Sequence, residues 1–221
     1  MAYIGRTKTP APLTSADIPD GIVTAADLAP DSVGTSEIAD SVTLVTPNLG
    51  TVATGNLSNT AIVYPAGHVL QTLIARNTGP EVISTTTWTA IPDMSLAITP
   101  SATSSKILVS VNLQVGGNVD KYILAVRLYR DSTSIGHADT EGSRPTAWMV
   151  SGAQVWDNYN TQSAVNFYLD SPNTTSATTY SLKIWDVRDN SYVFINRHGY
   201  NADTIDSPRG TSSMVLQEIA G

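Results

Sequence analysis

Few side chains in this sequence have a type and spacing that could support chemistry at a metal ion. The three histidines, His68, His137 and His198, are far apart, and none has a second histidine or an acid at the spacing of a zinc site. His137 comes nearest to a ligand set, because Asp139 and Glu141 follow it. We interpret these three residues as parts of a solvated polar loop, and we predict no metal site.

Catalytic motifs are missing as well. The sequence contains no cysteine, no GxSxG motif and no phosphate-binding glycine loop. Its carboxylates do not form a pair that differs in context from ordinary surface acids. We therefore predict that the protein is not an enzyme and that it uses no cofactor.

Aromatic residues are better candidates for binding. Trp156 and Tyr159 belong to the polar stretch WDNYN, and Tyr200 lies in a second polar stretch. An aromatic ring has a flat apolar face and, in Trp and Tyr, a polar edge, which suits carbohydrate. We select these three residues as candidates for receptor binding, although Trp156 and Tyr159 could instead pack in an interface between copies of the chain. We expect Trp88 and Trp185 to lie in strands and to belong to the core.

The elements that must position these residues are β-strands. All four Trp, both Phe and seven of the nine Tyr lie beyond Val69. Residues 107–115 alternate between an apolar face and a face that is polar except for Leu108, which is typical of a strand with one buried face. We expect eight to ten strands, drawn from the runs at residues 70–76, 82–91, 95–99, 107–115, 122–130, 147–156, 164–170, 180–187, 192–196 and 213–219. Short strands without intervening helices predict an all-β fold, an antiparallel β-sandwich of jelly-roll type.

Two long polar interruptions separate these strands, at residues 136–145 and 197–210. We expect both to be surface loops, where recognition residues are commonly found.

A different pattern occupies the beginning of the chain. Residues 13–22, 23–32 and 33–42 are three copies of a ten-residue segment with an aliphatic first residue, an acid fifth and an aliphatic sixth residue. Each copy has too few apolar side chains to form a core alone. We predict that these side chains are buried against copies of the chain or against a docking partner: Val23, Val33, Ile18, Leu28 and Ile38.

Local signals within the repeats favour single turns over long helices. Thr14 and Thr24 precede Asp17 and Asp27 by three residues, a spacing that caps a short helical turn. Prolines and glycines then end any helix. We expect residues 1–12 to form an extended arm, residues 13–68 a thin repeat stalk that serves as an anchor, and residues 69–221 a β-sandwich head.

Composition excludes several classes of partner. The formal net charge is −7, from 12 basic and 19 acidic residues, and no basic block could follow a phosphate backbone. We expect no nucleic-acid partner. The sequence has no run of apolar residues long enough to span a membrane and no signal peptide, so we expect no membrane insertion.

The strand and turn strings carry a family resemblance. The segments ITPSATSSKILVSVNLQVGG, RLYRDSTSIG, NFYLDSPNTTSATTYSLKIWDV and SSMVLQEIAG resemble the C-terminal domain of short-fibre and tail-fibre-like structural proteins of tailed bacteriophages, of the marine phage type. The resemblance covers about residues 80–221 and includes no catalytic motif. It implies a homotrimeric virion protein with a β-sandwich head on a thin stalk.

These observations lead to one functional hypothesis with two alternatives. The chain is expected to be a trimeric virion fibre, assembled in the host cytoplasm, that is anchored to other virion proteins through residues 1–68. Its head would attach to a glycan or protein of the host surface. The alternatives are a capsid decoration or cement protein, and a carbohydrate-binding module without a virion role.

Overall fold

A computed structural model describes residues 24–27, 64–84, 87–117, 120–155, 159–187 and 192–221. The chain divides into two units, Met1–Leu57 and Ser58–Gly221. Among the described residues, no helix is long and apolar enough to cross a membrane.

In the first unit, the described residues form one helical turn. The short 3-10 helix η2 spans Ala25–Asp27. The Thr24 backbone N–H and hydroxyl both donate to Oδ2 of Asp27, at 2.8 and 2.7 Å. These hydrogen bonds lower the pKa of the Asp27 carboxyl, the hydroxyl contributing most. The short capped turn predicted at Thr24 is formed, but only one of the two expected side-chain to backbone bonds is made, because the Thr24 hydroxyl donates to the Asp27 carboxylate. The corresponding turn at Thr14 and Asp17 lies outside the described residues.

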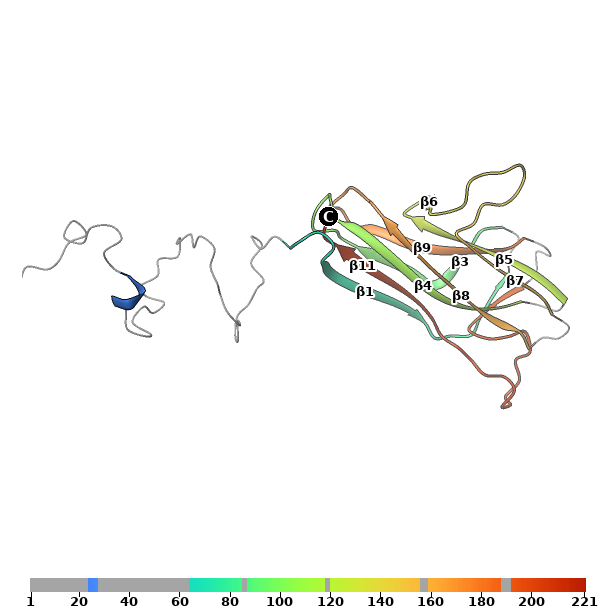
Figure 1. Cartoon of the computed structure of the whole chain (residues 1–221). Helices are drawn as coiled ribbons and strands as arrows, with labels where there is room; N and C mark the ends of the chain where they lie inside the picture. Colours follow the sequence, from blue (N-terminus) through green and yellow to red (C-terminus); the bar gives the residue numbers. More distant parts are fainter. Residues whose placement is uncertain (1–23, 28–63, 85–86, 118–119, 156–158, 188–191) are drawn as a thin grey trace, which may run out of the picture. The chain divides into compact units, whose positions relative to one another are not determined.

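The second unit, which we call the head, is built from antiparallel strands (Figure 1). The strands are β1 (Val69–Asn77), β2 (Glu81–Ser84), β3 (Thr89–Ile98), β4 (Lys106–Gly117), β5 (Asp120–Arg130), β6 (Thr133–Ile135), β7 (Met149–Val155), β8 (Thr161–Asp170), β9 (Thr178–Asp186), β10 (Tyr192–Ile195) and β11 (Ser212–Ile219). The all-β, antiparallel prediction is confirmed.

Each sheet is organised around one long strand. β8 pairs with one edge of β4, from the pair of Ile107 with Asp170 to the pair of Gly116 with Thr161. β11 and β10 pair with successive parts of the other edge of β4. β1 and β2 extend this first sheet beyond β11 and β10. In the second sheet, β9 lies on one edge of β5 and β6 and β7 share the other, while β3 pairs with β9.

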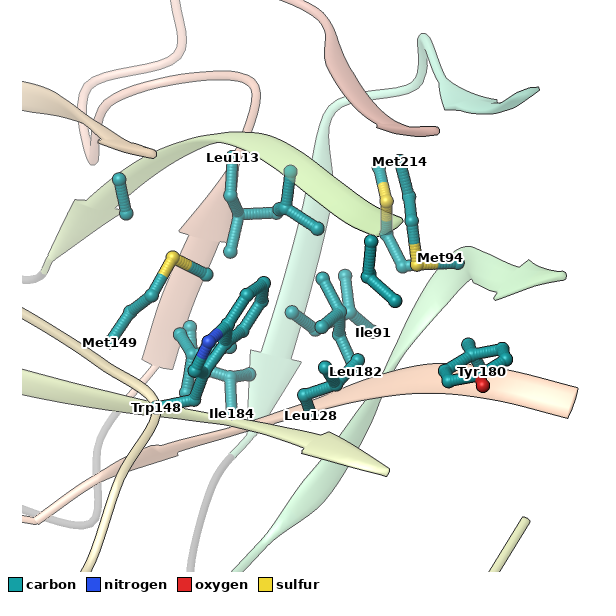
Figure 2. Close-up of a cluster of buried hydrophobic side chains, with 14 of the residues drawn as sticks. Ile91, Met94, Leu113, Leu128, Trp148, Met149, Tyr180, Leu182, Ile184 and Met214 are labelled. Atoms are coloured by element: carbon teal, nitrogen blue, oxygen red, sulfur yellow. The ribbon is translucent and has the colours of Figure 1, made fainter. Parts of the chain in front are cut away.

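The apolar sides of the two sheets enclose one core. β9 alternates buried and half-buried residues along its whole length, as a strand with one packed face must. The cluster in Figure 2 joins Leu113 and Met214 of the first sheet to Leu128, Leu182 and Ile184 of the second. All five side chains are fully buried, and burial of such side chains is the main stabilising contribution to a sandwich.

One sequence prediction about strand boundaries was wrong. We expected strands at 82–91 and 95–99, but β2 ends at Ser84 and β3 runs from Thr89 to Ile98. The pairing of β3 with β9 shifts between Ala90 and Ser95, and Asp93 has a φ of 56°. A bulge therefore keeps one strand continuous where the alternation of the sequence breaks.

The head has two distinct ends. At one end, which we call proximal, Val69 pairs with Ile219 and Ile219 with Lys106. Backbone hydrogen bonds of Gly67 and His68 with Ala220 join the two ends of the head's chain here, at 2.7 and 2.8 Å. At the opposite, distal end, Gly116 pairs with Phe194 and with Thr161.

Candidate binding site

The candidate residues from the sequence fall into two groups. Tyr159 and Tyr200 are described by the structure. The remaining candidates lie outside the described residues: Trp156, and Ile18, Leu28, Ile38, Val23 and Val33 of the repeats.

The structure brings Tyr159 and Tyr200 together. Tyr159 lies just before β8 and Tyr200 lies in the loop between β10 and β11, yet their ring centroids are 4.9 Å apart. The His198 ring joins them, 5.3 Å from Tyr159 and 6.2 Å from Tyr200. The two tyrosines are 48% and 36% exposed, whereas His198 is buried. We call Tyr159, His198 and Tyr200 the distal aromatic cluster.

A glycine allows the two loops to approach each other. A Cβ placed on Gly116 of β4 would lie 2.5 Å from the carbonyl oxygen of Arg197 and 3.2 Å from that of Asn160. Both atoms belong to the backbone, so neither could move aside cheaply. Only glycine lets the chain at Asn160 and the chain at Arg197 and His198 pack on the same point of β4.

The base of the β10–β11 loop is fixed by Asn196, which has a φ of 61° and is buried. Its amide nitrogen donates to the carbonyl oxygens of Asn77 and Gly79, each at 2.9 Å. Its Oδ1 accepts a hydrogen bond from the Ser212 hydroxyl at 2.7 Å. These contacts fix both ends of the β10–β11 loop, which contains Tyr200.

His198 is held by one hydrogen bond. Its Nε2 lies 3.1 Å from the carbonyl oxygen of Asp206, which can only accept, so Nε2 carries the proton. The buried Nδ1 has no hydrogen-bond partner in the described part of the chain. The imidazole therefore contributes a buried polar atom without a partner, within the described residues, to the distal aromatic cluster.

Sequence reasoning selected Tyr200 but missed His198 and Arg197. We expected residues 197–210 to be a surface loop, yet Arg197 and His198 are 8% and 3% exposed. Their burial results from the long-range packing of the loop on Gly116. The glycine in an otherwise alternating strand was the only local signal of such a close approach.

The chemistry available at the cluster is that of binding. Two exposed tyrosine rings offer apolar faces and hydroxyl groups to a ligand, as carbohydrate sites do. Within the described ranges, no group of three or more histidines and acids is placed to hold a metal ion. His137 and Asp139 are exposed, and Glu141 forms a surface ion pair with Arg144.

The remaining tryptophans differ from the prediction. Trp148 is buried in the core, but Trp88 and Trp185 are half-buried and lie outside it. They contact each other edge-on at 5.7 Å, and the Arg127 guanidinium lies 4.1 Å from the Trp88 ring centroid. Trp185 occupies a half-buried position in the alternation of β9, so it belongs to the outer face of the second sheet.

Comparisons with known proteins give little further information. The chain matches no protein-family model and no curated protein. Among solved structures, a chain described as "Structure of infectious bursal disease virus Gx strain" aligns with 12% identity and a TM-score of 0.35. The alignment covers 76% of this chain and 42% of that chain. Similarity at this level assigns neither a fold family nor a function.

Proposed function

We propose that this chain is a structural protein of a bacteriophage virion, a fibre whose head attaches to the host surface. The observation that carries the proposal is the position of the distal aromatic cluster. The chain enters the head at its proximal end, where the Ala220 backbone N–H donates to the carbonyl oxygen of His68. Tyr159 and Tyr200 lie at the other end, where Gly116 pairs with Thr161. A fibre needs this separation between its anchor and its receptor-binding surface.

Other features support the same role. The resemblance of the strand segments to phage fibre proteins supports a virion protein, and the antiparallel sandwich agrees with the head that such proteins carry. Residues 1–68 would contact other virion proteins, and the repeats would bury Ile18, Leu28 and Ile38 against copies of the chain in a homotrimer. The protein would be assembled in the host cytoplasm and remain in the virion.

Electron microscopy of particles carrying a gold-labelled antibody against the head tests the location. We expect label on fibres at the tail. Label distributed over the capsid shell would instead identify the chain as a capsid decoration protein. The absence of label from particles would contradict a virion role altogether.

Competition for host cells tests attachment. Purified protein should reduce adsorption of phage to its host, and the double variant Tyr159→Ala, Tyr200→Ala should lose most of that effect. The matched control is Tyr64→Ala, since Tyr64 is also an exposed tyrosine stacked on a histidine, 4.7 Å from His68, but at the proximal end. Equal loss in both variants would show that the cluster is not the attachment site.

A further inference from the structure

Beside the distal aromatic cluster lies an arginine whose charge is balanced by no acid among the described residues. Arg197 is 8% exposed, and its guanidinium carbon lies 4.4 Å from the centroid of the Phe194 ring. Within the described residues, its Nη1 donates to the carbonyl oxygens of His198 and Gly199, at 3.2 and 3.5 Å. Neither of the two ion pairs in the described part of the chain involves it. A buried cation held only by ring and carbonyl dipoles is under-compensated.

A second arginine increases this excess of positive charge. Burial and the nearby charge of Arg209 together lower the pKa of Arg197. Arg209 contacts the side-chain oxygen of Asn201 at 3.5 Å and is exposed. Asp203 and Asp206 belong to the same loop, but neither forms an ion pair with an arginine within the ranges that the structure covers. Two like charges are thus kept close together in a protein of net charge −7.

His198 adds an unmet demand for a donor. Its buried Nδ1 is an unsatisfied acceptor, and a buried polar atom without a partner is costly. Nδ1 is itself out of reach of a ligand, but a ligand with a carboxylate would compensate the arginines, of which Arg209 is exposed. The arginine fork matches a carboxylate in a bidentate manner.

We infer that the distal end of the head binds an acidic saccharide, whose sugar ring lies against Tyr159 and Tyr200 and whose carboxylate is bound by Arg197 and Arg209. This inference rests on the proposed role in host attachment and names the class of receptor. Nucleic acid would also combine rings with negative charge, but a chain of net charge −7 repels a polyphosphate.

The test uses the full chain and matched pairs of saccharides. Oligogalacturonate is compared with the same oligosaccharide after reduction of its carboxyl groups, and sialyllactose with lactose, by isothermal titration calorimetry. We expect the acidic member of at least one pair to bind about tenfold tighter or more, as the loss of a charge-assisted bond predicts. Arg209→Gln should reduce the difference within that pair to about twofold.

Arg144→Gln is the matched control, because it removes the same charge from an exposed arginine in a different loop, and we expect its affinity to be unchanged. Arg209 is used first because it is exposed, so its replacement should not unfold the head. Arg197→Gln is measured after its thermal midpoint has been compared with that of the wild type.

The outcomes separate the two proposals. Equal binding of the acidic and neutral members would overturn the acidic saccharide and leave host attachment through the tyrosines standing. Loss of binding in Arg144→Gln equal to that in Arg209→Gln would overturn the arginine site. If none of the four saccharides binds but the protein still blocks phage adsorption, only the present inference is overturned. Tighter binding of a sulfated or phosphorylated oligosaccharide, or of oligodeoxythymidylate, would also overturn it.

Discussion

Gly116 lies where three parts of the head meet, and its missing side chain is what permits the contact. The carbonyl of Arg197 would be 2.5 Å from an added Cβ, and the Cα of His198 would be 3.1 Å away. Real Cβ atoms essentially never come as close to another atom as the 2.5 Å to this carbonyl oxygen. Any larger residue here must displace the β10–β11 loop.

We predict that Gly116→Ala destabilises the head by about 1–3 kcal/mol, the usual cost of overpacking. The variant should also lose saccharide binding, because Tyr200 would move away from Tyr159. Chemical denaturation and calorimetric titration measure the two effects. Gly79→Ala is the control, since its added Cβ would meet the flexible end of Glu81 at 3.1 Å and Asn77 Oδ1 at an ordinary contact distance of 3.9 Å. Equal free energies of unfolding for the two variants would show that the β10–β11 loop can shift without destabilising the head.

Glu218 is a second residue whose surroundings make a prediction possible. This carboxylate is 1% exposed at the proximal end and accepts hydrogen bonds from Ser101, Ser105 and Gln71. Burial by itself raises the pKa of Glu218, but the hydrogen bonds from Ser101, Ser105 and Gln71 outweigh it, and the pKa lies below its ordinary value.

Because the folded-state pKa of Glu218 is lowered, its contribution to stability is present above the unfolded-state pKa and is lost as pH falls through the folded-state pKa. We predict that Glu218→Gln costs about 1.5–3 kcal/mol at neutral pH. The difference from the wild type should shrink in acid. Urea unfolding across the acidic range measures this. Glu141→Gln, at an exposed ion pair, should change stability little at any pH, and a pH-independent loss in Glu218→Gln would contradict the assignment.

At the scale of elements, strand content was predictable because one-sided burial leaves a period of two in the sequence. β4, β9 and β11 show it plainly, and their alternation agrees with the prediction. Long-range effects were not predictable. The bulge at Asp93 depends on pairing with β9, and the outer position of Trp185 depends on which face of β9 meets the core. Likewise, the approach of Tyr159 to Tyr200 depends on loops that are distant in sequence.

The two sheets are also joined by a buried polar contact. Asp170 at the end of β8 accepts two hydrogen bonds from Arg130 of β5, at 3.0 Å, and one from the Tyr180 hydroxyl of β9, at 2.6 Å. Burial and the bond to Asp170 raise the pKa of Tyr180. We predict that Tyr180→Phe costs about 1–2 kcal/mol in urea unfolding. Tyr129→Phe is the control, because Tyr129 contacts Lys183 through its ring, and a loss of the same size there would contradict a specific role for the contact.

The edge strand β8 carries an unusual surface. Val165, Phe167 and Leu169 alternate along it and are 69%, 72% and 50% exposed. Apolar groups gathered on an exposed strand are typical of a contact surface. We predict that Phe167→Ser weakens self-association of the full chain by about tenfold or more in sedimentation equilibrium.

The control for this prediction is Ile205→Ser. Ile205 is 97% exposed but lies alone in the distal loop, so its replacement should leave association unchanged. If Phe167→Ser associates as tightly as the wild type, the chain forms its oligomer without β8.

At the scale of the whole molecule, the head has a core of its own. Its strands all lie between Val69 and Ile219 and pair with one another. We predict that deletion of residues 1–42 leaves the thermal midpoint of the head within about 2 °C of the wild type. The same deletion should abolish incorporation into particles, measured by mass spectrometry of purified phage. Incorporation of the truncated protein would place the anchor elsewhere in the chain.

The pairing of β1 with β11 also determines how the head would bear load. The ladder runs from Val69–Ile219 at the proximal end to Asn77–Ser212 near the distal loop. Tension applied at the start of β1 while the distal tyrosines hold a receptor would act along this ladder, so its hydrogen bonds would resist together in shear instead of opening one at a time. A head connected in this way can remain folded under forces that would unzip a hairpin pulled from its open end.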